Sequence, residues 1–73
     1  MIHSYYNYII CNEYTSQCLK KGEDVNRLSY WDNGNRVTVE AVQIKDINKD
    51  EIMVETKDYD EITIPIEEIE DWN

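Results

Sequence analysis

Apolar and polar residues alternate along much of the chain from Val25 onward, which is the period of a strand that buries one face. Four segments carry this pattern: Val25–Trp31, Arg36–Ile44, Glu51–Thr56 and Ile62–Ile66. They are short and rich in β-branched and aromatic residues. The pattern therefore predicts about five short strands joined by tight turns.

Three polar clusters between these segments predict the turns. Asp32-Asn33-Gly34 is a strong hairpin signal, because Asn and Gly tolerate a positive φ. Asn48-Lys49-Asp50 and Asp58–Asp60 are turns of similar composition. Pro65 has no backbone N–H to donate, so the strand that contains it must be an edge strand or must end there.

The alternation of apolar residues changes phase within the second segment, Arg36–Ile44. Val37 and Val39 share one face, whereas Val42 and Ile44 fall on the other. A bulge near Glu40–Ala41 would turn both pairs to the same side, as the strands of a barrel often need.

Residues 12–21 predict a short helix. Asn12 is a good N-cap, an acid follows in the first turn, and two lysines occupy the last turn. Gly22 stands where a helix commonly ends on a left-handed residue. Tyr14 and the two cysteines would form a narrow stripe that packs on the sheet.

Together these elements predict a single domain, residues 1–73, that is mostly β with one N-terminal helix. A small Sm-like or SH3-like five-stranded barrel fits the order best, because closing a sheet removes vulnerable edges. Residues 1–10 are expected to form an extended, tyrosine-rich N-terminal arm. Residues 66–72 repeat an apolar residue every three positions and predict a closing helical turn.

The formal charge of −9 lies entirely in residues 46–73, which hold eleven acids and two lysines, whereas acids and bases balance in residues 1–45. Such a field repels nucleic acid and attracts basic surfaces. A solvated, highly soluble surface would explain the same charge without any partner. The asymmetry still points toward a basic protein partner.

The sequence offers little for catalysis or metal binding. His3 is the only histidine, and no third group is evident that would orient it toward a cysteine nucleophile. On one helix, Cys11 and Cys18 would lie about 10 Å apart along the axis, too far for a disulfide, so we expect free thiols in a reducing compartment. The zinc, calcium and phosphate-loop patterns are all incomplete. We expect a non-enzymatic protein with no cofactor and no metal.

No apolar run reaches 18 residues, and no signal-peptide pattern opens the chain. We therefore expect a cytoplasmic protein that does not contact membranes. Pro65 and the acidic run that follows disfavour pairing between sheet edges, which favours a monomer.

Several short motifs resemble those of the Rof (YaeO) family, bacterial antiterminators that bind the transcription termination factor Rho. Residues 8–14, Tyr-Ile-Ile-Cys-Asn-Glu-Tyr, resemble the family's start, which typically reads Pro-Ile-x-Cys-Asp-x-Tyr-Asp and enters the helix. The spacings from Cys11 to Gly34 and from Gly34 to Glu51 look the same as in the family. Residues 62–69 are similar to its final strand.

The chain departs from the family pattern at three positions. Tyr8 replaces a proline, Asn12 stands where an acid is usual, and Thr15 replaces an aspartate. If those acids contact Rho, this chain would bind differently or bind another partner.

The resemblance implies an Sm-like barrel that binds the RNA-binding N-terminal region of Rho and blocks RNA loading. An acidic competitor suits such a surface, because a surface that binds RNA is basic. Two alternatives stay open. One is a phage-type acidic mimic of nucleic acid that inhibits another host enzyme acting on DNA or RNA. The other is an Sm-like RNA-binding protein, which the lack of a basic stripe disfavours, so no direct nucleic-acid binding is expected.

Partner-binding residues are expected at the start of the helix and around the turn near residue 48. They are Asn12, Glu13, Tyr14, Gln17, Asp46, Asn48, Asp50 and Glu51. For Tyr14 we favour a core position over a contact position.

Overall fold

The computed structural model describes residues 3–73, which form eight strands and one turn of 3-10 helix. In chain order they are β1 (His3–Tyr6), β2 (Ile9–Asn12), β3 (Cys18–Lys20), β4 (Asp24–Asp32), β5 (Asn35–Ile47), β6 (Glu51–Glu55), β7 (Glu61–Pro65), η1 (Ile66–Glu68) and β8 (Ile69–Trp72). The strands build two antiparallel sheets, one in the order β1-β2-β3 and one in the order β7-β6-β5-β4-β8.

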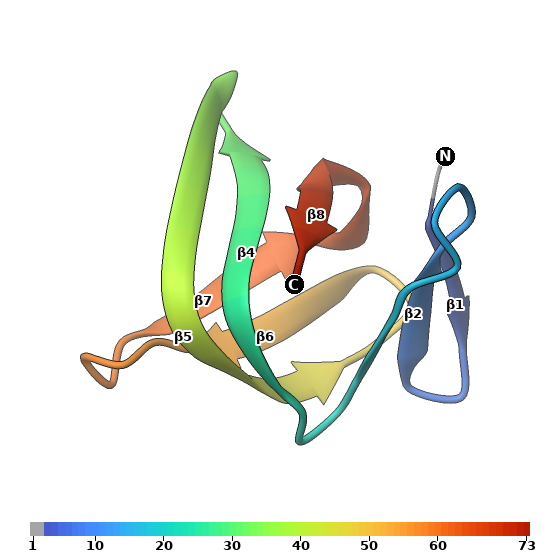
Figure 1. Cartoon of the computed structure of the whole chain (residues 1–73), viewed down its shortest axis with the longest axis horizontal. Coiled ribbons are helices and arrows are strands. Elements are labelled where there is room, and N and C mark those ends of the chain that lie inside the picture. Colours follow the sequence, from blue (N-terminus) through green and yellow to red (C-terminus); the bar gives the residue numbers. More distant parts are fainter. Residues whose placement is uncertain (1–2) are drawn as a thin grey trace.

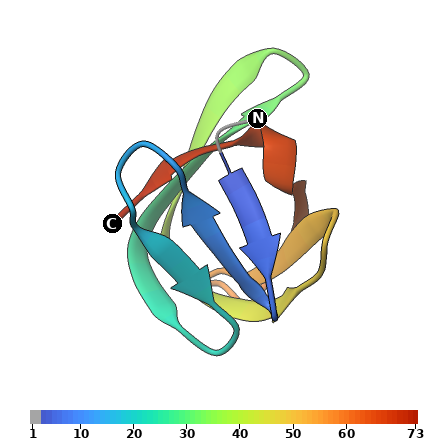
Figure 2. The ribbon, with the colours of Figure 1, turned by 90° about the vertical axis from the view of Figure 1, so that its right-hand side faces the viewer.

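The three-stranded sheet lies beside the curved five-stranded sheet (Figure 1), and it stands in front of that sheet when the molecule is turned (Figure 2). Ile10 and Leu19 face each other across β2 and β3, and both are fully buried. They belong to one core cluster with residues of the larger sheet, among them Leu28, Val42, Ile44, Ile52, Val54, Ile64 and Trp72. The two sheets therefore share a single core.

The long strand β5 connects the two halves of the larger sheet. Its first part pairs with β4, and its last five residues pair with β6. Ala41 has a φ of +53°, and both Glu40 and Ala41 are exposed, so Val37 and Val39 face the same side as Val42 and Ile44. The expected bulge at Glu40–Ala41 is wrong, because the register between β4 and β5 is unbroken from the Val25–Val42 pair to the Arg27–Glu40 pair. The positive φ of Ala41 produces the phase change instead. A register shift against β6 does occur farther along β5, between Ile44 and Asp46, where the strand bends (Figure 1).

The tight turns lie where the sequence predicts them. Asn33 and Gly34, with φ of +51° and +81°, join β4 to β5, and Asp32 pairs with Asn35 across them. The side-chain oxygen of Asn48 accepts hydrogen bonds from the backbone N–H groups of Asp50 (2.8 Å) and Glu51 (2.9 Å). The Asn48 side chain thus fixes the β5–β6 turn locally, and the Thr56 hydroxyl accepts similar backbone hydrogen bonds in the β6–β7 turn.

The chain closes the larger sheet with its last residues. Pro65 ends β7, which is an edge strand, as expected from its missing donor. The expected closing helical turn is a single 3-10 turn, after which β8 returns to pair with β4. Ile66, Ile69 and Trp72 are all buried, which explains their three-residue spacing.

The predicted fold class is wrong in its N-terminal helix. Within residues 3–73 the structure has no α-helix, and residues 12–21 form the end of β2, an exposed turn and β3. The side-chain oxygen of Asn12 does accept backbone hydrogen bonds, from Tyr14 (2.8 Å) and Thr15 (3.1 Å), but it closes a tight turn. The same capping chemistry serves a helix start and a turn, so it did not distinguish them. The structure therefore has two sheets where we expected a five-stranded barrel with a helix.

The expected free thiols are also wrong, for the same reason. Because the segment is a hairpin, Cys11 and Cys18 are cross-strand neighbours with Cα atoms 4.1 Å apart, and they form a disulfide. A separation of seven residues that places two sulfurs far apart on a helix brings them together across a tight turn.

The predicted N-terminal arm is wrong for the residues that can be compared. Residues 3–10 form β1 and part of β2 of a hairpin, and residues 1–2 of the predicted arm lie outside the described residues. Asn7 and Tyr8 form the hairpin turn with φ of +50° and +65°. Over residues 3–73, no helix combines the length and apolar character needed to cross a membrane.

Candidate protein-binding surface

The eight residues predicted to bind a partner fall into two groups. Asn12, Glu13, Tyr14 and Gln17 belong to the tip of the β2–β3 hairpin. The other four lie at the end of β5, in the β5–β6 turn and at the start of β6. In Figure 2 the hairpin tip lies at the upper left and the β5–β6 turn lies on the right. The fold therefore does not bring the two groups together into one compact site.

In the hairpin tip, the residues have different roles. Asn12 is buried and holds the turn, so it is unsuited to contact a partner. Glu13 and Gln17 are exposed, and Tyr14 has 81% of its surface exposed. The core position favoured for Tyr14 is wrong, because the turn points it into solvent.

In the second group, the side chains of two residues already interact with other parts of the chain. Asp46 lies 3.6 Å from the ammonium of Lys21 and accepts a hydrogen bond from the backbone of Ile47. Asn48 holds the turn. Asp50 and Glu51 keep exposed side chains that are free for a partner.

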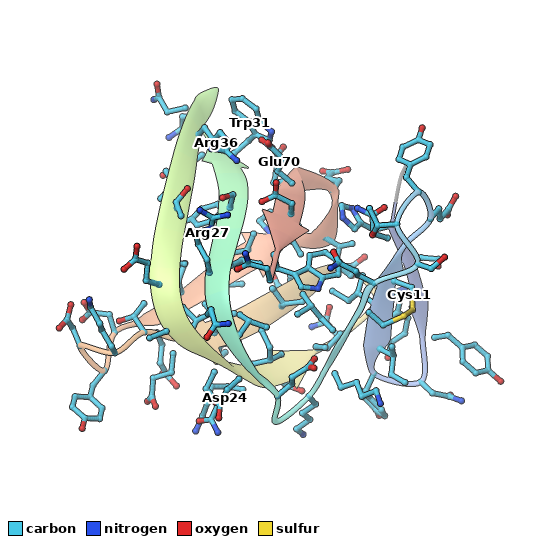
Figure 3. The ribbon with its side chains drawn as sticks, in the orientation of Figure 1. Cys11, Asp24, Arg27, Trp31, Arg36 and Glu70 are labelled. Carbon is cyan, nitrogen blue, oxygen red and sulfur yellow. A yellow bond between two sulfur atoms is a disulfide. The ribbon has the colours of Figure 1, made fainter. Side chains whose placement is uncertain are left out.

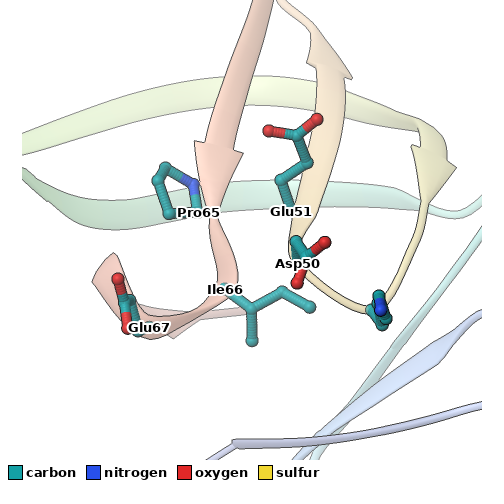
Figure 4. Close-up of a pocket in the computed structure, with 6 residues that line it drawn as sticks. Asp50, Glu51, Pro65, Ile66 and Glu67 are labelled. Atoms are coloured by element: carbon teal, nitrogen blue, oxygen red, sulfur yellow. The ribbon is translucent and has the colours of Figure 1, made fainter.

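Asp50 and Glu51 line a pocket of about 410 Å³ (Figure 4). The other lining residues are Lys49, Pro65, Ile66 and Glu67. The backbone N–H of Ile66 donates to the carbonyl of Asp50 at 3.0 Å, which fixes the two walls relative to each other. The sequence analysis did not predict Glu67. The signal that could have found it is Pro65, which ends β7, pairs with Glu51 and stands two residues before Glu67.

The acids continue from this pocket along the outer side of β6 and β7. Glu55 lies directly opposite Glu61, and Met53, which is 37% exposed, lies opposite Thr63. Like charges directly opposite each other in an antiparallel pair are destabilising. We use the name acidic face for Asp50, Glu51, Glu55, Glu61 and Glu67.

Other acids of the C-terminal segment are partly neutralised by bases from the first half of the chain. Arg36 lies 3.0 Å from Glu70 and 3.7 Å from Asp71, beside the end of the β4–β5 hairpin (Figure 3). These pairs are exposed and contribute little to stability. None of the salt bridges seen among residues 3–73 involves a residue of the acidic face. The negative charge without a salt-bridge partner therefore includes this face.

Two titratable groups in the structure have shifted pKa values. Burial lowers the pKa of His3, and the nearby carboxylate of Glu13 opposes that shift. Burial raises the pKa of Tyr30, and the charge of Asp32 raises it further. Both groups are buried, and neither lines the pocket beside Asp50.

Within the part of the chain that the structure describes, no three side chains of His, Cys, Asp or Glu are grouped as metal ligands. The pocket presents carboxylates, one ammonium and two apolar side chains. Such a surface can attract and seat cationic groups.

Comparison of the chain with protein-family models, with curated proteins and with solved structures gives no match.

Proposed function

We propose that the protein is a non-enzymatic inhibitor that covers a basic, nucleic-acid-binding surface of another protein with its acidic face. The first target is the RNA-binding N-terminal region of transcription termination factor Rho, where an occupied surface would prevent RNA loading. In this proposal the protein acts as a monomer in the cytoplasm, without cofactor or metal, and it makes no direct contact with nucleic acid.

One observation carries the proposal: the acidic face contains like charges in direct opposition that the described part of the chain leaves uncompensated. Glu55 and Glu61 lie opposite each other, while the arginine at residue 36 pairs with acids elsewhere. An arrangement that costs stability in the free protein becomes favourable when a basic surface supplies the missing positive charge. A surface that binds RNA carries such charge, because it contacts phosphates through lysine and arginine.

The test is a titration of the protein against purified Rho at two salt concentrations, with labelled RNA as competitor. We expect binding that weakens as salt rises, because the attraction is between charged surfaces and salt screens it. We also expect RNA to be excluded from the complex. Binding that leaves RNA loading unchanged would contradict the proposed mechanism.

Charge reversal locates the surface. We expect Asp50→Lys, at the pocket, to weaken binding about tenfold or more, which corresponds to about 1.4 kcal/mol. Asp32→Lys is the matched control, because it makes the same change in net charge at the exposed end of the β4–β5 hairpin, outside the acidic face. Glu13→Lys tests the hairpin tip in the same way. Equal losses for Asp50→Lys and Asp32→Lys would show that only net charge matters.

The structure of residues 9–20 is a reason to consider a target other than Rho. The resemblance to Rho-binding proteins includes a helix after residue 11, and this segment is a hairpin. A basic surface of a different enzyme that acts on DNA or RNA would suit the same acidic face. Absence of binding to Rho at low salt, together with inhibition of such an enzyme that Asp50→Lys relieves, would select this target class.

A further inference from the structure

A disulfide closes the tip of the β2–β3 hairpin. Cys11 and Cys18 pair across the two strands, next to the Ile10–Leu19 pair that points into the core. Since side chains alternate along a strand, the two sulfurs lie on the outer face. Both cysteines are partly exposed, and Figure 3 shows the sulfur–sulfur bond on this hairpin. A small dithiol in solution can therefore reach the bond.

The tip beyond the disulfide, residues 12–17, is otherwise held mainly by hydrogen bonds within its own turn, including those that the Asn12 side chain accepts from the backbone of Tyr14 and Thr15. Residues 13–17 are all exposed. The backbone N–H of Asn12 donates to the carbonyl of Gln17 at 2.8 Å, and that of Ser16 donates to the carbonyl of Asn12 at 2.9 Å. Ser16 adopts a φ of +62°, a conformation that an L side chain rarely prefers. The disulfide is thus the strongest link that holds this turn closed.

The base of the hairpin is anchored without the disulfide. Ile10 and Leu19 have no exposed surface. Just after β3, the backbone N–H of Gly22 donates to the carbonyl of Ile44 at 2.7 Å, and that of Ile44 donates to the carbonyl of Glu23 at 2.8 Å. These contacts tie the chain to β5. Breaking the disulfide would therefore free the tip while the sheets keep their packing.

We propose that Cys11–Cys18 is a thiol–disulfide exchange site for a dithiol reductant, and that its reduction releases residues 12–17. A thiolate of the dithiol attacks one sulfur, forms a mixed disulfide and expels the other sulfur as a thiolate, which takes up a proton. The second thiol of the reductant resolves the mixed disulfide and leaves as part of a cyclic or protein disulfide. The two cysteines gain two electrons and two protons, and the reductant loses them.

This inference stands without the proposed function, because its test needs no partner. The full chain is incubated under native conditions with dithiothreitol and then with N-ethylmaleimide, and the added groups are counted by mass. Amide hydrogen exchange is followed on the oxidised and reduced protein. We expect both cysteines to be alkylated only after reduction, and amide exchange in residues 12–17 to become about tenfold faster or more. Exchange in β4–β8 should stay within about twofold.

The double variant with Cys11→Ser and Cys18→Ser is the control. We expect its amide hydrogen exchange to match that of the reduced protein and to be the same with and without dithiothreitol. Three results would overturn the proposal: no alkylation without denaturant, exchange in the tip that is the same in both redox states, or loss of protection throughout β4–β8 on reduction. The last result would make the disulfide a structural cross-link of the whole fold.

Discussion

At the scale of single residues, His3 is the most unusual group in the structure. It has 1% of its surface exposed and lies against Trp72, with ring centroids 5.8 Å apart. Neither ring nitrogen has a hydrogen-bond partner among residues 3–73. A buried polar group without a partner costs stability, and a charged one costs more. Protonation of this ring is therefore opposed by the fold.

This position predicts a loss of stability in mild acid. Burial lowers the pKa of folded His3 below the usual value of 6.5, so the unfolded chain binds more protons in that range. The contribution is complete above pH 6.5 and is lost as the pH falls from there toward the folded pKa. We expect the free energy of unfolding to fall by up to about 1.4 kcal/mol per pH unit from this group. Urea unfolding at about pH 7.5 and about pH 5.5 measures it.

His3→Phe is the matched variant, since it keeps a ring against Trp72 and cannot titrate. It should lose less stability than the parent over the same pH interval. As the chain has one histidine, its imidazole NMR signals also report the folded pKa directly. An identical loss in parent and variant would contradict the prediction.

Gly34 gives a second prediction at this scale. Its φ of +81° lies in the left-handed region, and no atom lies within 4 Å of a Cβ placed there. Gly34→Ala should therefore cost only the conformational preference of the backbone, about 1 kcal/mol. Thermal unfolding of Gly34→Ala beside Asn35→Ala, an exposed neighbour, measures the difference. A larger effect at Asn35 would show that the turn is not strained by a side chain at position 34.

At the scale of elements, the opposition of Glu55 and Glu61 across β6 and β7 predicts an unusual response to charge. Glu61→Lys would place a cation opposite Glu55 and should stabilise the free protein by about 0.5 kcal/mol. Glu61→Gln removes the repulsion without adding attraction and should give a smaller gain. Urea unfolding of the three proteins at low and high salt checks this order, and the gain should shrink as salt screens the pair.

If the acidic face binds a basic partner, the same substitution that stabilises the free protein should weaken the complex. Such opposite effects distinguish a functional charge from a merely tolerated one. A Glu61→Lys variant no more stable than Glu61→Gln would show that the two side chains do not interact.

The strands and turns from Val25 to Pro65 could be predicted from sequence, whereas residues 12–21 and the strand β8 could not. In Glu51–Glu55 and Glu61–Pro65, the alternation of the strands and the turn residues between them agree with each other. Around Asn12 the local signals fit a helix start as well as a turn, and only the pairing of Ile10 with Leu19 decides between them. That pairing depends on burial against residues of the larger sheet, which are distant in the sequence. The sequence of residues 12–21 alone therefore cannot predict it.

At the scale of the whole molecule, the total charge was readable from the sequence, whereas its location in space was not. Residues 46–73 carry all of the net charge, but Glu70 and Asp71 meet Arg36, and Asp46 meets Lys21. The acids of this segment that make no salt bridge within residues 3–73 lie on β6, β7, the turns at their ends and η1. Predicted contact residues at the hairpin tip and the β5–β6 turn therefore belong to separate surfaces, because the two sheets place them apart.

The return of β8 to β4 has a consequence for synthesis on the ribosome. Leu28 and Trp72 are cross-strand partners, although almost the whole of the larger sheet lies between them in the chain. While a nascent chain still lacks β8, one side of β4 is an open edge beside Leu28 and Tyr30. Such an edge can pair with other nascent chains. Productive folding of the larger sheet must therefore wait for β8 to emerge.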